Sequence, residues 1–243
     1  MLKRDASLYQ QFLGIVESNA YDKRSEILPS VEKAAGLFNG PLIRARHMRQ
    51  DGMALKIDAE LSDYMHHVAT RSNENVDQRA NPLYAAAVVF TADGQLLFGV
   101  SGTSTEAIYT GRRNIPAGLV HPVLDAVDGK PYVAMSLQRE LLEEAGLVFE
   151  NFEKLHPFFV VREDEMRHPS VIYEGRLSID EERTLRRFEA QKQRDLFLGE
   201  RPEFDQLVFV KFDRNSLQNE IENNRSLYHN RVLIILKHLL SSL

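Results

Sequence analysis

Three glutamates, Glu140, Glu143 and Glu144, stand close together in the segment Arg139–Leu147. Residues three and four apart are neighbours on a helix, so this spacing crowds the carboxylates at a cost of roughly 0.2–0.5 kcal/mol for each like-charged pair. Gly146 is predicted to lie just past the helix end, where the helix dipole disfavours the anions of the last turn. A hard divalent cation with oxygen ligands would turn this repulsion into binding. The segment therefore predicts a metal site.

A solvated helix face is the alternative interpretation, because glutamate-rich stretches commonly lie on the surface. An apolar stripe that such a helix would bury is present at Ala134, Leu137, Leu141 and Ala145. Both interpretations require the same helix. The pattern predicts it over about residues 132–145, entered through Pro131, since proline suits a first helical turn.

The segment Arg139–Leu147 resembles the second half of the Nudix box, Arg-Glu-apolar-any-Glu-Glu-any-Gly-apolar, and matches every specified position. Upstream, residues 115–118 (Ile-Pro-Ala-Gly) are similar to the loop that opens the box, with Ala117 where a first glycine is usual. The resemblance implies an α/β fold, an α/β/α sandwich with a mixed sheet. It also implies a divalent-metal-dependent pyrophosphohydrolase that cleaves a nucleoside diphosphate linked to another moiety.

The resemblance further implies a cofactor, Mg²⁺ or Mn²⁺, and its ligands. Glu140, Glu143 and Glu144 would bind the metal, and the backbone carbonyl of Ala117 or Gly118 would join them. Arg139, next to Glu140 in the sequence, would hold that carboxylate by a charge-assisted hydrogen bond. The catalytic residues are then Arg139, Glu140, Glu143 and Glu144.

The spacer between the two halves of the box departs from the family pattern. The spacer, residues 119–138, is longer than the fixed spacer of the family pattern, and it contains no glutamate where the first half of the box should have one. Asp125 and Asp128 are candidate replacements, although an aspartate before Gly129 is also typical of turns. His121 could contact substrate or metal, or be an ordinary loop histidine.

The resemblance leaves the general base open. Glu140 serves as the base in some family members, and a glutamate from a distant loop does so in others. Glu200, Glu203 and Asp205 stand where such a loop could be. The alternative is that these three form a charged turn before a strand.

Substrate contacts are predicted from arginines, which suit bidentate phosphate binding. Arg112 and Arg113 come just before the loop at 115–118 and could point at a diphosphate, or be surface arginines. Arg44 and Arg46 alternate along one predicted strand and share a face, so one of them could contact base or phosphate. Tyr64 could stack on a base or belong to the core.

A narrower resemblance extends over roughly residues 37–147. Short matches at 37–44, 61–64, 81–83, 86–91, 115–118 and 121–122 are similar to the Nudix branch that cleaves UDP-glucose and UDP-galactose. This implies a nucleotide sugar as substrate, and a nucleoside monophosphate and a sugar phosphate as products. The alternatives are ADP-ribose, a dinucleotide, a nucleoside triphosphate, or a non-catalytic Nudix domain that senses a nucleotide.

Composition agrees with a globular enzyme. The chain has 243 residues, 43% hydrophobic and 27% charged, with a formal net charge of −5 and no cysteine. The charge gives no general attraction to nucleic acid or to anionic membranes, and the absence of cysteine excludes disulfides and thiolate metal sites. No apolar run is long enough to cross a membrane, and the polar start lacks the apolar segment of a signal peptide. We therefore expect a cytoplasmic protein with a small-molecule partner, which could act as a homodimer.

The predicted organisation is an N-terminal accessory α+β subdomain over residues 1–80 and a hydrolase domain over residues 81–243. The first ~35 residues are predicted to be helical, and the polar stretch 70–80 to be a linker or loop. The further predicted strands are 42–48, 53–57, 85–90, 96–100, 155–161, 171–177 and 207–212, and the further helices 61–69, 179–194, 217–221 and 227–240.

Overall fold

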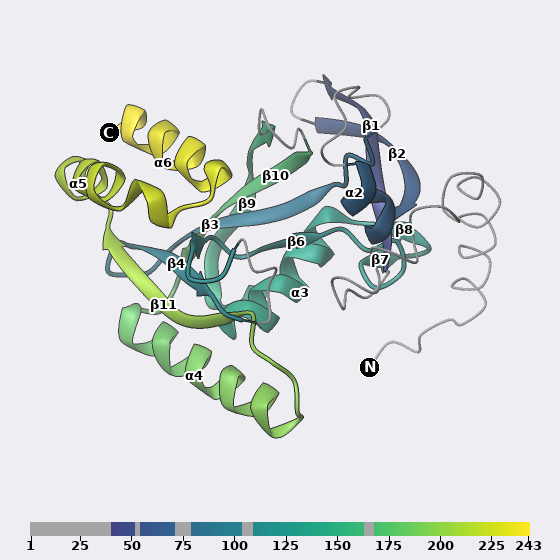
Figure 1. Cartoon of the computed structure of the whole chain (residues 1–243). Coiled ribbons are helices and arrows are strands. Elements are labelled where there is room, and N and C mark those ends of the chain that lie inside the picture. The colour runs from purple at the N-terminus through teal and green to yellow at the C-terminus, as the bar shows by residue number, and fades with distance from the viewer. Residues whose placement is uncertain (1–39, 52–53, 71–78, 104–108, 163–167) are drawn as a thin grey trace. The chain divides into compact units, whose positions relative to one another are not determined.

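The computed structural model describes residues 40–51, 54–70, 79–103, 109–162 and 168–243 (Figure 1). The predicted N-terminal helices lie outside the described residues, as does most of the predicted linker at 70–80. The chain divides into two compact units. The described part of the first comprises residues 40–51, 54–70 and 79–84, Leu119–Ser136 and part of Arg162–Pro169. The second comprises the described residues of Ala85–Gly118, Leu137–Val161 and Ser170–Leu243.

The first unit contains a long antiparallel hairpin, β1 (Pro41–Asp51) and β2 (Ala54–Asp63). It confirms the hairpin predicted around residues 51–52 and extends it at both ends. The helix expected from residue 61 begins later, as α2 (Tyr64–Thr70). The reason is that residues 61–63 complete the strand, with Asp63 paired to Pro41.

The surplus residues of the spacer also belong to the first unit and form a second, smaller hairpin. Its strands are β7 (Ala126–Val127) and β8 (Lys130–Pro131). The connecting residues Asp128 and Gly129 both have positive φ, 51° and 74°, as a two-residue hairpin turn requires. Pro131 ends this strand instead of starting the following helix, so its predicted helical position is wrong.

The second unit is organised around a seven-stranded sheet with the order β11-β4-β3-β10-β9, to which β5 adds beside β4 and β6 beside β3. The strands are β3 (Tyr84–Phe90), β4 (Gln95–Ser101), β5 (Arg113–Asn114), β6 (Ala117–Leu119), β9 (Phe152–Arg162), β10 (Pro169–Leu177) and β11 (Phe204–Lys211). The predicted hairpin of β3 and β4 turns at Gly94, whose φ is +80°. Its strands pair antiparallel.

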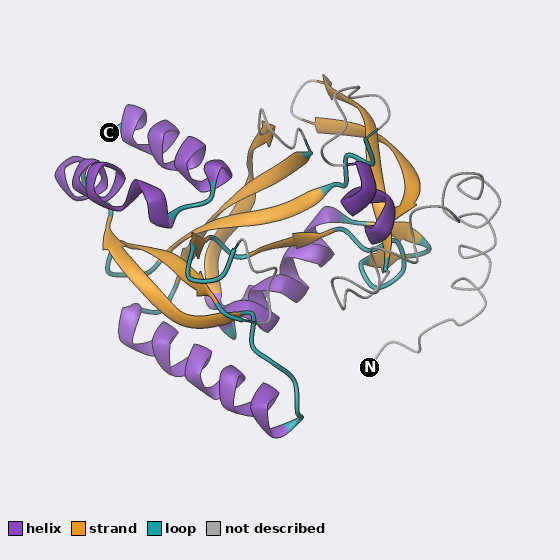
Figure 2. Cartoon of the chain, in the orientation of Figure 1, coloured by secondary structure: helices purple, strands orange, loops and turns teal. Residues whose placement is uncertain are grey.

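Helices cover both faces of this sheet (Figure 2). They are α3 (Val133–Ala145), α4 (Glu181–Phe197), α5 (Arg214–Asn224) and α6 (Asn230–Ser242), and short 3-10 turns follow at Phe149–Asn151 and Arg225–Leu227. Alternate residues of β3, such as Ala86 and Val88, pack with α5 and α6 in one core cluster. The intervening Ala87 and Val89 are equally buried, so the opposite face is also covered. The predicted α/β class and sandwich are confirmed.

Two of the helices begin at aspartates that cap them. Asp180 accepts a hydrogen bond from the Arg183 amide at the start of α4, and Asp213 accepts one from the Ser216 amide at the start of α5. Such caps are worth about 1 kcal/mol each. No helix in the described part of the chain is both long and apolar enough to span a bilayer.

Candidate metal site

Helix α3 carries the glutamates and ends where the sequence predicts. Leu137, Leu141 and Ala145 are completely buried, which confirms most of the predicted apolar stripe. Gly146 follows with φ +66°, and its amide donates to the Leu142 carbonyl at 3.0 Å. A Cβ at Gly146 would lie 2.5 Å from the Arg187 carbonyl oxygen. Glycine is therefore required there by both its conformation and its surroundings.

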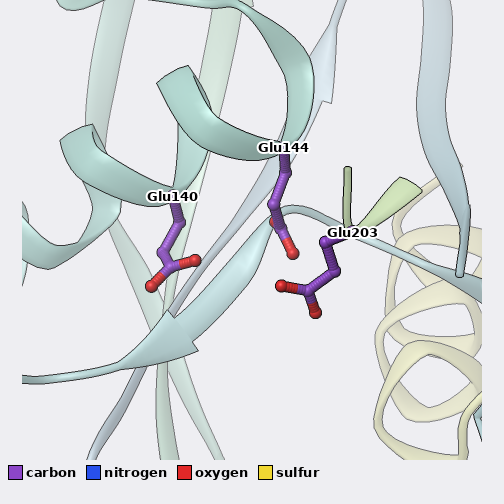
Figure 3. Close-up of side chains that lie close together, drawn as sticks. All are labelled: Glu140, Glu144 and Glu203. Atoms are coloured by element: carbon purple, nitrogen blue, oxygen red, sulfur yellow. The ribbon is translucent and has the colours of Figure 1, made fainter. Parts of the chain in front are cut away.

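Three carboxylates converge beside this helix (Figure 3). Glu140 and Glu144 come from α3, Glu203 comes from the segment before β11, and one oxygen of each lies within 4.8 Å of the others. Glu140 and Glu144 are 6% and 2% exposed. A solvated helix face is therefore the wrong interpretation for these two residues.

The loop that opens the box holds Glu144. The Ala117 amide donates to its Oε2 at 2.8 Å. Its other oxygen, Oε1, is buried, and no hydrogen-bond donor among the described residues reaches it. A buried carboxylate oxygen without a partner is costly, so this atom fits the role of a metal ligand.

Gly118 leaves the space that Glu140 fills. A Cβ at Gly118 would lie 1.8 Å from Oε1 of Glu140, closer than any real contact. Arg139 contacts the same carboxylate oxygen, with Nη1 2.5 Å from Oε1. The predicted contact between Arg139 and Glu140 is confirmed.

Glu143 lies beside the cluster and is not one of its members. Its side chain is 56% exposed, and its Oε2 is 3.3 Å from Nη1 of Arg139. The sequence predicts Glu143 as the third helix ligand, whereas the structure brings Glu203 together with Glu140 and Glu144. A ligand role for Glu143 stays a prediction.

Long-range strand pairing delivers Glu203. Strand β11 runs antiparallel to β4, with Phe204 opposite Ser101 and a bulge before Gln206. The Gly102 amide donates to the Glu203 carbonyl at 2.8 Å. The ring of Phe204, fully buried, occupies the place where a Cβ on Gly99 would lie, 2.0 Å away.

Of the three loop acids considered from the sequence, only Glu203 joins the cluster. The Glu200 amide donates to the Asp195 carbonyl, and the Asp205 carbonyl accepts from Nζ of Lys192 at 2.6 Å. These contacts hold the loop on either side of Glu203. From the sequence, Glu203 is one of three acids that could provide a distant-loop glutamate, and no local pattern separates it from Glu200 and Asp205.

Burial and mutual repulsion disfavour ionisation of the cluster in the metal-free protein. Burial raises the pKa of Glu140 from its ordinary 4.5 to about 8, although the charge of Arg139 opposes the shift. Burial, with the charges of Glu203 and Glu140, raises the pKa of Glu144 well above its ordinary value. Burial and the charge of Glu143 also raise the pKa of Glu203.

We expect the metal-free protein to lose stability as the pH rises from 6.5 to 8. The folded state keeps the Glu140 proton up to pH about 8, whereas an unfolded chain releases it near 4.5. The contribution of Glu140 to the free energy of unfolding is therefore greatest below pH 4.5. It falls as the pH rises, by about 2 kcal/mol between pH 6.5 and 8.

Urea unfolding with chelator present, at several pH values, measures this loss. His229 contributes little to the change across this interval, because burial lowers its pKa from 6.5 to about 4 and its effect on stability is nearly complete once the pH passes 6.5. Glu140→Gln should make the slope between pH 6.5 and 8 shallower, with the remainder contributed by Glu144 and Glu203, whose pKa values are also raised. An equal slope in the variant would assign the pH dependence to other groups.

A divalent cation fits this arrangement on three observations. The donor set is three carboxylates, the type of ligand that Mg²⁺ and Mn²⁺ take. Glu144 Oε1 is buried without a donor among the described residues. The backbone at Gly118 leaves open the space that the Glu140 carboxylate occupies. Glu140, Glu144 and Glu203 would therefore hold the ion.

Asp125 and Asp128, the two aspartates of the spacer, lie in turns. Asp125 is 1% exposed, and its Oδ2 accepts from the His121 amide at 2.7 Å. The imidazole Nδ1 of His121 accepts from the amides of Val123 and Leu124. Asp128 occupies the hairpin turn. Neither aspartate belongs to the carboxylate cluster of the described residues.

Two of the predicted substrate arginines lie in the second unit. Arg112 is exposed. The guanidinium of Arg113 forms an ion pair with Glu220, donates to the Tyr228 hydroxyl at 3.3 Å, and lies over the Tyr228 ring. Arg113 is therefore engaged in a structural network. Contact of either arginine with substrate stays a prediction.

The other substrate candidates lie in the first unit. Nη1 of Arg44 is 3.8 Å from Oε2 of Glu60, and Nε of Arg46 donates to the same oxygen at 2.6 Å. The two arginines thus share one partner, as expected for one strand face. The ring of Tyr64 lies 6.0 Å from that of His67, a residue that is itself buried.

No family model matches the chain, and no curated protein matches it. Among solved structures, it is similar to a Nudix hydrolase from Nitrosomonas europaea, with 16% identity over 66% of this chain and 88% of that one, and a TM-score of 0.40. It is also similar to the MutT protein from Methanosarcina mazei Go1 (12% identity, 65% and 91% covered, TM-score 0.42). A third is the Nudix domain of Shewanella oneidensis NrtR complexed with ADP ribose (13% identity, 72% and 96% covered, TM-score 0.43).

Proposed function

We propose that the chain is a Nudix hydrolase, a divalent-metal-dependent pyrophosphohydrolase acting on a nucleoside diphosphate linked to another moiety. The substrate that we propose is a nucleotide sugar such as UDP-glucose, cleaved to a nucleoside monophosphate and a sugar phosphate. The metal is Mg²⁺ or Mn²⁺. The resemblance of residues 139–147 to the Nudix box supplies the family, and the structure supplies the geometry that supports the activity.

The observation that carries the proposal is the burial of Glu140 and Glu144 next to Glu203. Burying clustered carboxylates is expensive unless a cation or hydrogen bonds compensate. Glu144 receives one such bond, from the Ala117 amide. A protein that bound a nucleotide without cleaving it would have no use for this cluster, so we favour an enzyme over a sensor.

We assign the residues of the site different roles in metal binding and catalysis. Glu140 and Glu144 hold the ion from the helix, Arg139 keeps Glu140 in place, and the Gly118 carbonyl is a further candidate ligand. When bound, the ion supplies neutralisation of the diphosphate charge and a lower pKa for the attacking water. Arg112 remains our candidate for a phosphate contact, since it is exposed near this loop.

Glu203 is the one residue of the cluster that is exposed at the surface, although burial of its carboxyl group raises the pKa of that group. We therefore assign it the proton that the attacking water releases, besides its contact with the ion. In the reaction, the water oxygen forms a bond to one phosphorus of the diphosphate. The bond between that phosphorus and the bridging oxygen breaks, and the bridging oxygen leaves with the other phosphate.

A substrate panel tests the proposal. The protein is incubated with UDP-glucose, ADP-ribose, a dinucleotide and nucleoside triphosphates, with Mg²⁺, Mn²⁺ or chelator. The reactions are stopped with acid, and the release of nucleoside monophosphate is measured by anion-exchange chromatography. We expect release from UDP-glucose that requires the metal and stops with chelator.

Release from ADP-ribose alone would keep the reaction and replace the nucleotide sugar as substrate. Silence across the panel would contradict the hydrolase proposal. If nucleotide still raised the melting temperature of the silent protein, the non-catalytic sensor would take its place.

A further inference from the structure

Arg231 is a buried cation at the start of α6. It is 6% exposed, and among the described residues of the second unit it is the only arginine classed as buried. A buried guanidinium is costly unless acceptors satisfy its donors. The partners of Arg231 therefore indicate why it is retained.

Two of these partners lie on separate strands of the sheet. Nη1 donates to the Ser170 hydroxyl on β10 at 3.2 Å, and Nη2 contacts Oδ1 of Asn114 on β5 at 3.5 Å. The same Asn114 oxygen accepts from the Ile115 amide at 3.0 Å. The fork of Arg231 thus connects α6, β10 and the first residues of the loop that opens the box.

The loop continues from this anchor directly to the metal site. The Pro116 carbonyl accepts from the Ala87 amide of β3 at 2.9 Å. The Ala117 amide, one residue later, donates to Glu144 Oε2. Asn114, Pro116 and Ala117 are therefore fixed one after another, and the last of these contacts sets the orientation of a buried metal-binding carboxylate.

We propose that Arg231 is a positioning residue for the metal site: through Asn114 it holds the loop at residues 114–117, so that the Ala117 amide aims Glu144 at the ion. This inference rests on the proposed function.

If Arg231 acted only through its charge, its substitution would change the Mn²⁺ affinity differently than if it acts by positioning the loop. A cation near a bound cation repels it, so removing the charge of Arg231 should strengthen metal binding if charge were all that mattered. Lysine keeps the charge but lacks the planar fork that reaches two acceptors at once. Arg231→Lys therefore separates the two explanations.

The experiment measures Mn²⁺ affinity by calorimetry on the folded full-length protein at pH 7.5. The variants are Arg231→Met, Arg231→Lys, Asn114→Ala and the double variant Arg231→Met/Asn114→Ala. Arg176→Met is the matched control, because it removes an arginine that pairs with Glu174 and lies over Phe90. We expect each single variant of Arg231 and Asn114 to weaken Mn²⁺ binding about tenfold.

The double variant should bind Mn²⁺ no more weakly than the single variants, because both changes break one connection. Arg176→Met should bind like the unchanged protein. Full affinity in Arg231→Lys, tighter binding in Arg231→Met, or additive losses in the double variant would overturn the positioning role. Failure of the unchanged protein to bind Mn²⁺ would instead contradict the proposed function. Circular dichroism confirms that each variant is folded.

Discussion

Glu144→Gln is expected to lower kcat/KM about a thousandfold or more, since the ion's contribution is worth several kcal/mol and each 1.36 kcal/mol is tenfold. The thermal stability of the metal-free variant should not fall with the activity. Glutamine can still accept from the Ala117 amide, and it removes the cost of keeping a buried carboxyl protonated, which its raised pKa imposes on the metal-free fold. The metal-free variant should therefore melt at the same temperature as the unchanged protein or higher.

Paired measurements of turnover and melting temperature, each with Mn²⁺ and with chelator, check this prediction. The stabilisation by Mn²⁺ should be lost in Glu144→Gln. Glu182→Gln is the matched control, because it makes the same change on the exposed face of α4, where Glu182 pairs with Arg186. Near-normal turnover in Glu144→Gln would remove this residue from the metal site.

Gly118→Ala is expected to lower activity about a hundredfold, the scale that a displacement of roughly 1 Å can cost. The added Cβ would lie 1.8 Å from Oε1 and 2.6 Å from Cγ of Glu140. Glu140 must therefore swing away from both the cluster and Arg139. Its side chain can move, so we expect a loss of only about 1–3 kcal/mol in unfolding free energy.

Turnover, Mn²⁺ affinity and urea unfolding of Gly118→Ala check the prediction together. Gly129→Ala is the comparison variant. Gly129 has φ +74° and nothing within 4 Å of an added Cβ, so alanine there costs about 1–2 kcal/mol of backbone strain. It should leave turnover unchanged. Equal turnover losses in both variants would show that destabilisation, and not the Glu140 contact, causes the effect at Gly118.

Local sequence patterns predict much of this fold, because helices and hairpin turns form most of their backbone hydrogen bonds between residues that are close in the sequence. Helix α3 and its end at Gly146 follow from the apolar stripe and from the need for a left-handed residue. The hairpins around residues 51–52 and 93–94 follow from Asp-Gly turns. Tertiary pairing sets the remaining boundaries. The start of α2 is one case, since strand pairing with Pro41 extends β2 to Asp63.

In the metal site, the sequence brings the two helix glutamates together but does not bring Glu203 to them. Glu140 and Glu144 lie one helical turn apart, so the sequence places them together. Glu203 reaches them only through the pairing of β11 with β4 and the bulge that follows Phe204, which no local pattern encodes. Arg113 shows the same limit. Its position before the loop suggests a phosphate contact, which stays a prediction, and its ion pair with Glu220 could not be foreseen because that partner is distant in the sequence.

The hairpin of β7 and β8 has a consequence for how such sites vary between proteins. It interrupts the box, yet it belongs to the compact unit that does not contain the carboxylate cluster. The loop that opens the box contacts the helix glutamates directly, since the Ala117 amide donates to Glu144. The length between them is therefore free to drift during evolution, and searches for related enzymes in genomes should score the two halves of the motif separately, with an unrestricted gap.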